Sequence, residues 1–156
     1  MKERMKITGK FVAVLRDRDG KVKQRITTRN AFTDDGYDLL CALLGSGAED
    51  FLSHLAIGWG TGADTPFSAD QVDLQGEYAE RKAAVFAHAG GTKVLTLSAT
   101  WGIAEPIDDT VNIEEYGVFN ALAGPTMLSR AVRSPALSKL TTDELDLTWT
   151  LTLSQP

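Results

Sequence analysis

The sequence predicts an all-β fold, a jelly-roll-like β-sandwich of about eight antiparallel strands with one short α-helix. Two segments support this prediction because their apolar residues recur at every second position, as on the buried face of a strand. In segment 144–153 these residues are Leu145, Leu147, Trp149, Leu151 and Leu153. In segment 93–101 they are Leu95, Leu97, Ala99 and Trp101. A single stretch with helical spacing, residues 34–44, adds the helix.

The N-terminal residues predict a β-hairpin whose turn is Asp19-Gly20, a pair that favours tight turns. The first strand should bury Phe11, Ala13 and Leu15. The second strand alternates between two faces. One face carries Val22, Gln24 and Ile26, and the other is cationic, with Lys21, Lys23 and Arg25.

The helix is expected to have about three turns. Thr33 is a suitable N-cap, and the following acidic residues suit the positive N-terminal end of a helix dipole. Gly45 can end the helix. The expected buried stripe consists of Tyr37, Leu40, Cys41 and Leu44, so Cys41 is interpreted as a small buried hydrophobe.

The remaining strands are expected near residues 52–59, 111–119 and 126–133, the last two joined by a Gly-Pro loop. Gly90-Gly91 predicts a tight turn between strands at about 82–89 and 92–102. With the N-terminal hairpin and segment 144–153, these segments give the predicted eight strands.

Composition indicates one globular domain spanning residues 1–156, with 43% hydrophobic and 24% charged residues. No apolar run reaches about 18 residues, so no membrane association is expected. The first six residues lack the apolar core of a signal peptide. The single cysteine is typical of a protein from a reducing compartment.

Charge is distributed unevenly along the chain. Residues 1–30 hold ten Lys or Arg against three Asp or Glu, a net charge of +7, whereas residues 31–156 hold six against eighteen, a net charge of −12. A basic N-terminal hairpin (about 1–30) on an acidic body predicts a docking arm for an acidic protein surface or for neighbouring copies. Nucleic acid is the less favoured partner, because stacking aromatics and a basic helix are missing and the isoelectric point is near 5.0.

Residues 58–63 satisfy the dinucleotide-binding pattern G-x-G-x-x-G/A. Such a loop binds phosphate only when a helix starts within it, and here the chain continues through Asp64 and Pro66 without an apolar helical face. We therefore interpret the loop as a strand exit, and no nucleotide cofactor is expected.

Other chemistry-bearing residues also favour structural roles. His54 and His88 lack the spacing of metal ligands, and no serine-centred nucleophile motif occurs. The acidic pairs 34–35, 108–109 and 114–115 are interpreted as turn or surface residues, since strand neighbours point to opposite faces. The sequence thus predicts a protein that is not an enzyme, with no catalytic residue, cofactor or metal.

Several short motifs follow one another in a fixed order within residues 29–153. They are N-x-x-T-x-x-G-x-x-L-L at 30–40, L-A-I-G-W-G at 55–60, L-x-x-E near 74–77, E-x-G-V-F at 115–119, M-L-x-R at 127–130 and T-D-x-L-x-L-T-W-T at 142–150. Their order and spacing resemble those of a group of small structural proteins of tailed bacteriophages. One departure is that Glu77 and Glu80 both precede Arg81, so either could be its partner.

The resemblance implies a virion structural protein made in the bacterial host cytoplasm and assembled into the phage particle. A short chain without fibrous repeats favours a capsid decoration (cement) protein that binds the major capsid protein or other virion proteins, as a homo-oligomer, with a trimer as the expected form. A head or tail appendage component is the alternative. On this reading polar residues tie loops to strands or subunits, namely Glu77, Arg81, Glu115 and Arg130.

A third alternative is a receptor- or carbohydrate-binding jelly-roll module. Its site would be formed by the loops around Trp59 and Phe67, as an exposed aromatic pair. A buried Trp59 would instead favour the structural role.

Overall fold

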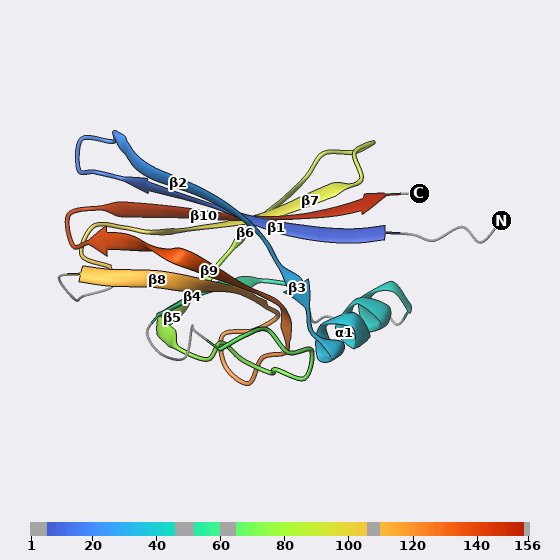
Figure 1. The fold of residues 1–156 in the computed structure, drawn as a ribbon. Coiled ribbons are helices and arrows are strands. Elements are labelled where there is room, and N and C mark those ends of the chain that lie inside the picture. Colours follow the sequence, from blue (N-terminus) through green and yellow to red (C-terminus); the bar gives the residue numbers. More distant parts are fainter. Residues whose placement is uncertain (1–5, 46–51, 60–64, 106–109, 155–156) are drawn as a thin grey trace.

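The computed structural model describes residues 6–45, 52–59, 65–105 and 110–154, which form two antiparallel sheets packed face to face and one helix (Figure 1). Sheet A contains, in spatial order, β2 (Val22–Arg29), β1 (Lys6–Arg16), β10 (Glu144–Ser154), β7 (Val94–Trp101) and β6 (Val85–His88). Sheet B contains β3 (Ala31–Phe32), β9 (Met127–Leu140), β8 (Thr110–Phe119), β4 (His54–Trp59) and β5 (Glu77–Ala83). The helix is α1 (Asp34–Gly45). The predicted all-β sandwich with one short helix is confirmed, with ten strands in the described residues rather than about eight.

The core lies between the two sheets and is built from the inward residues of the alternating strands. In sheet A, Phe11, Trp149 and Leu97 form one row across three neighbouring strands, and each side chain is fully buried. Tyr116 of sheet B faces this row, with its ring centroid 5.6 Å from that of Phe11. The inner faces predicted for β1, β7 and β10 are therefore confirmed, except that Leu95 is half-buried and Leu153 is 38% exposed.

The N-terminal hairpin is an integral part of sheet A and not a separable arm. β1 lies between β2 and β10, and it pairs with β10 over eleven residues, from Lys6↔Ser154 to Arg16↔Glu144. Ile26 of β2 is buried in the same core. The hairpin predicted as a docking arm (residues 1–30) is thus part of the sandwich over its described residues: its inner face completes the core, while its outer face lies in solvent.

The helix begins as predicted but buries a different face. Thr33 accepts a hydrogen bond from the Gly36 N–H at 2.9 Å, as an N-cap does. The buried residues of α1 are Gly36 and Leu39. A Cβ atom at Gly36 would lie 2.2 Å from the Leu128 carbonyl oxygen, so only glycine permits this close approach to β9.

The predicted apolar stripe of α1 is consequently wrong at three of its four residues, while Leu40 packs against the core. Tyr37 is 48% exposed, Leu44 is 80% exposed and Cys41 is also exposed, while Leu40 is half-buried. The helix packs against the β9 backbone through Gly36, its smallest residue. This contact is so close that it leaves no room for a side chain at position 36.

The differences between the predicted and the observed strands have physical causes. β3 is too short for a periodic pattern, and β5 is too highly charged to resemble a half-buried strand. β9 extends from Met127 to Leu140, well beyond the predicted residue 133. Its pairing with β8 shifts register between Ile113 and Glu115, and Pro135 lies in the unpaired stretch, where a missing N–H is tolerated.

We predict that Trp149→Ala lowers the free energy of unfolding by about 3–5 kcal/mol, because it empties the centre of the core. Chemical denaturation measures this loss. Leu153→Ala on the same strand removes a partly exposed side chain and is the matched control, with an expected loss of at most about 1 kcal/mol. Equal losses in the two variants would contradict the assigned core.

Candidate functional site

The outer face of sheet A carries a group of cationic side chains on neighbouring strands. Strand register places Lys10 of β1 between Arg29 of β2 and Thr150 of β10. One step along the strands, Thr8 lies opposite Thr152, and at the end of the sheet Lys6 lies opposite Ser154. The side chains of all these residues lie on the solvent-facing side of sheet A, because residues two positions apart in a strand point to the same face.

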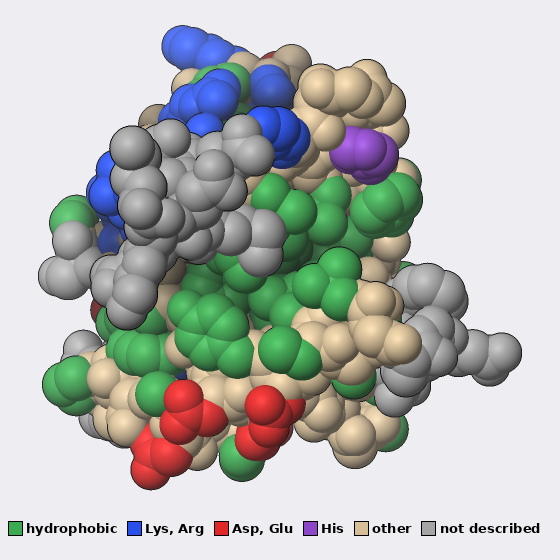
Figure 2. All heavy atoms as spheres, turned by 90° about the vertical axis from the view of Figure 1, so that its right-hand side faces the viewer, with side chains coloured by type: hydrophobic (Ala, Val, Ile, Leu, Met, Phe, Trp, Pro, Cys, Tyr) green, Lys and Arg blue, Asp and Glu red, His purple; other side chains and the backbone are tan. Residues whose placement is uncertain are grey.

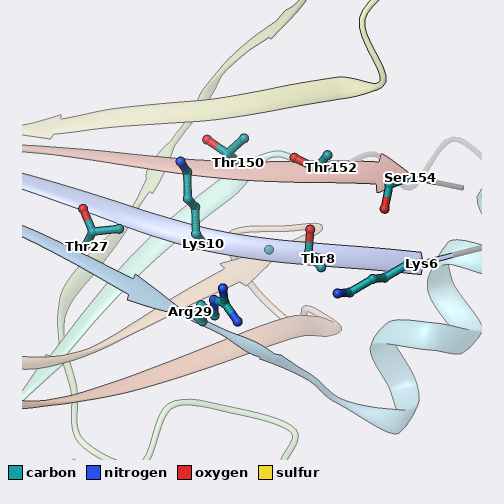
Figure 3. Close-up of a pocket in the computed structure, with 9 residues that line it drawn as sticks. Lys6, Thr8, Lys10, Thr27, Arg29, Thr150, Thr152 and Ser154 are labelled. Atoms are coloured by element: carbon teal, nitrogen blue, oxygen red, sulfur yellow. The ribbon is translucent and has the colours of Figure 1, made fainter. Parts of the chain in front are cut away.

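These residues line a shallow groove, which we name the basic groove (Figure 3). Its volume is about 560 Å³, and its lining residues are Lys6, Thr8, Gly9, Lys10, Thr27, Arg29, Thr150, Thr152 and Ser154. The lining contains three cations and five hydroxyl groups but no carboxylate. Ammonium, guanidinium and hydroxyl groups donate hydrogen bonds to carboxylates, so the groove suits an anionic surface.

The cations of the groove have no ion-pair partner among the described residues. Lys6, Lys10 and Arg29 are exposed, and none forms a salt bridge with a described Asp or Glu. Arg25, one step further along β2 and opposite Val14, is likewise exposed and without such a partner. Their charge is therefore free to act on a partner.

The three cations predicted for docking at the hairpin have different environments. Lys21 and Arg25 are exposed. Lys23 donates a hydrogen bond from Nζ to Asp143 at 2.6 Å, and the Asp143 carboxylate is only 1% exposed. Lys23 thus neutralises a buried carboxylate of its own chain, whereas the free cations cluster on β1 and the end of β2.

The aromatic loop site proposed from the sequence lies partly outside the described residues. Phe67 is half-buried. The side chain of Trp59 lies outside the described residues, as do residues 60–64, so the loop of residues 58–63 and its phosphate-binding pattern are largely outside them too. The acidic pair 108–109 also lies outside the described residues.

Glu115 and Arg130 form a fully buried ion pair. Arg130 Nε lies 2.6 Å from a Glu115 carboxylate oxygen, and both side chains have no exposed surface. Glu115 also accepts a hydrogen bond from the Gly76 N–H at 2.6 Å, while Arg130 donates one to the Thr65 carbonyl at 2.9 Å. The pair therefore joins β8 and β9 to the segment that leads into β5.

Arg81 is the centre of a second polar cluster. Its guanidinium donates to Glu77 at 2.8 Å and to Asp73 at 2.9 Å, and it lies 4.2 Å from the centroid of the Phe119 ring. Of the two glutamates that the sequence offered, Glu77 makes this contact; the side chain of Glu80 lies outside the described residues. Partial burial and the neighbouring Asp73 raise the pKa of Glu77 to about 7, although Arg81 opposes the shift.

Two buried residues of a third polar cluster were not singled out from the sequence. Lys139 is 1% exposed and donates hydrogen bonds from Nζ to the carbonyls of Gly102 and Asp143, at 2.9 and 2.6 Å. Burial lowers its pKa. Asp143 accepts a hydrogen bond from the Leu140 N–H at 3.1 Å. The signal was present in the alternation, because Lys139 falls two positions after the buried Leu137.

The described residues offer no metal site, since none of their His, Cys, Asp and Glu side chains gather in groups of three or more. The Nδ1 atom of His54 lies 2.8 Å from the Ser53 hydroxyl oxygen, and the Nδ1 atom of His88 lies 2.7 Å from the Val94 carbonyl oxygen. Glu114 and Glu115 differ in burial, as expected for opposite faces.

In the part of the chain that the structure describes, α1 is too short and too polar to cross a membrane.

We predict that Arg130→Met lowers the free energy of unfolding by about 3–5 kcal/mol, because it leaves the Glu115 carboxylate buried without its cation. Chemical denaturation measures the loss. Arg16→Met is the matched control, since Arg16 pairs with Asp146 where both side chains are 37% exposed, and such pairs contribute about 0–1 kcal/mol. A similar loss in both variants would mean that burial of the pair is unimportant.

We predict a pH dependence of stability from Glu77. Its pKa is raised from 4.5 to about 7, so the folded protein holds a proton that the unfolded chain releases. This contribution to stability is fully present below about pH 4.5 and is lost as the pH rises through about 7. Thermal unfolding of the wild type and Glu77→Gln across this range measures it. The wild type should lose stability relative to the variant, and parallel curves would contradict the raised pKa.

No family model, curated protein or solved structure matches the chain.

Proposed function

We propose that this chain is a structural protein of a tailed-bacteriophage virion, a capsid decoration (cement) protein that docks on an acidic surface of the shell through the basic groove. The partner is the major capsid protein or another virion protein, and the protein acts as a homo-oligomer. It would be made in the bacterial host cytoplasm and incorporated into the phage particle. An appendage of the head or tail is the alternative location.

The unpaired cations of sheet A are the observation on which this proposal rests. Lys6, Lys10 and Arg29 line one groove that contains no carboxylate, although the chain as a whole has a net charge of −5. Exposed charge pairs within a single chain contribute little to folding, whereas an array of like charges steers an oppositely charged protein surface and fixes its orientation. The array therefore favours a docking role.

The positions of the shared motifs support a structural role. Glu115, Gly117 and Phe119 of one motif are buried, and Arg130 of the next pairs with Glu115. A Cβ atom at Gly117 would lie 2.7 Å from the Phe119 ring. These residues are used to hold sheet B and its adjoining segment together, as expected for a scaffold that acts through its surface.

A protein–protein contact is favoured over a nucleic-acid contact. The lining of the basic groove has no aromatic side chain on which a base could stack. The isoelectric point of about 5.0 also opposes general attraction to a polyanion. A folded acidic surface, which presents carboxylates without bases, fits the groove better.

We predict that Lys10→Glu combined with Arg29→Glu abolishes binding to shells of the phage that encodes the chain, prepared without this protein. The variant places two carboxylates in the groove and repels an acidic partner. Co-sedimentation with shells measures binding. For the wild type, binding should also weaken with salt, because the Debye length falls from about 10 Å at 0.1 M to about 3 Å at 1 M.

The matched control is Arg18→Glu combined with Lys21→Glu, which changes the net charge equally at exposed residues of the β1–β2 turn outside the groove. This control should still bind shells. Equal loss in both variants would mean that only net charge matters, and undiminished binding of the groove variant would exclude the groove. Association of the wild type with tails and not with shells would establish the appendage alternative.

A further inference from the structure

The four sheet edges of the sandwich are protected to very different degrees. Free edges expose backbone hydrogen-bonding groups, and proteins protect them with charges, bulges or very short strands. β2 carries Lys23, Arg25 and Arg29, and its pairing with β1 shifts register at Leu15. β5 is charged and irregularly paired with β4, and β3 has only two residues.

β6 lacks these protections. Its sequence, Val-Phe-Ala-His, contains no formal charge and no proline, and it pairs with β7 without any shift in register. All four residues are exposed, with Val85 at 70% and Phe86 at 62%. Although short, β6 therefore offers an uncharged, regular edge on which another strand can pair.

An apolar surface adjoins this edge. A second groove of about 390 Å³ has a mainly apolar lining with one cation at the β6–β7 turn, namely Phe86, Val94, Leu95, Leu151 and Leu153 together with His88, Thr92 and Lys93. Figure 2 shows this end of the molecule, where hydrophobic side chains gather between the Lys and Arg above and the Asp and Glu below. The strand edge and the groove belong to one continuous surface through Phe86.

We propose that β6 pairs with β6 of a second copy of this chain, in an antiparallel arrangement about a two-fold axis. The occupant must present an uncharged strand with a free edge and an apolar residue that reaches the groove. Among the described strands only β6 has these properties, so the surface is complementary to itself. Two five-stranded sheets would then form one continuous sheet across the dimer.

The two-fold axis also restricts the register. Residues directly opposite in an antiparallel pair lie on the same face, so a symmetric pairing places one residue opposite its own copy. With Phe86 opposite the second Phe86, Val85 lies opposite the second Ala87, and both aromatic rings lie on the side of the apolar groove. This pairing gives a dimer in place of the trimer suggested by the sequence.

The proposal deepens the self-association included in the proposed function, and it is tested on the isolated protein, so shell binding does not affect the outcome. Sedimentation velocity of the wild type should show a concentration-dependent dimer. Phe86→Lys should weaken dimerisation at least about tenfold, because it places a charge in the pairing edge and removes the central apolar contact. Val72→Lys, which alters an equally exposed residue outside the strands, should leave the dimer unchanged.

Cross-linking tests the register. In a Cys41→Ser background, Val85→Cys combined with Ala87→Cys keeps Phe86 and should form a disulfide-linked dimer on mild oxidation, because the two cysteines of each copy lie opposite those of the other, with Cβ atoms about 4.5–5.5 Å apart, near the disulfide range. Val72→Cys should remain monomeric on denaturing gels. A monomeric wild type at all concentrations, a dimer that tolerates Phe86→Lys, or a dimer that the double-cysteine variant does not cross-link would each overturn the proposal. Circular dichroism establishes that each variant is folded.

Discussion

The antiparallel pairing of β1 with β10 is the interaction on which the rest of the structure depends. It joins the two ends of the described chain over eleven residue pairs and lies at the centre of sheet A. The inward residues of these strands, including Phe11 and Trp149, form the core, while the outward Lys10 and Thr150 form part of the basic groove. Because alternate residues of one strand serve both purposes, the core fixes the positions of the cations.

Buried charges provide a second constraint, on the segments that the β ladders do not hold. Burying an ion pair costs more free energy of desolvation than a surface pair does, and its main benefit can be conformational specificity. Glu115 and Arg130 hold the residues that precede β5, and Lys139 holds the carbonyls of the β9–β10 turn and of Gly102. These contacts have defined geometry, so they fix segments that apolar packing alone would leave free to shift.

The sequence predicted the parts of the fold that follow from strict alternation and missed those decided by tertiary contacts. Residues 144–153 revealed a strand and its inner face because every second residue is apolar. The helix face was assigned wrongly because burial at Gly36 depends on the approach of the β9 backbone, which no helical periodicity encodes. Among the predicted docking cations, the pairing of Lys23 with Asp143 spans 120 residues and cannot be read from local sequence. The location of free cations on β1 likewise required the register of three strands.

The two proposed surfaces have a joint consequence. When two sheets become one across a two-fold axis perpendicular to the sheet, each strand turns by about 20–25° relative to its neighbour, so the two ends of a ten-stranded sheet face different directions. The β6 pairing would therefore place the two basic grooves near opposite ends of the joined sheet, facing different directions, while the apolar groove and Phe86 are covered between the copies. A second binding event gains a high effective concentration only where both grooves can be engaged at once, so the dimer would bridge two separate acidic surfaces rather than bind one surface twice. Docking on the shell then needs only one groove of each dimer, and its weak, salt-sensitive contact is strengthened only where the other groove meets a second acidic surface.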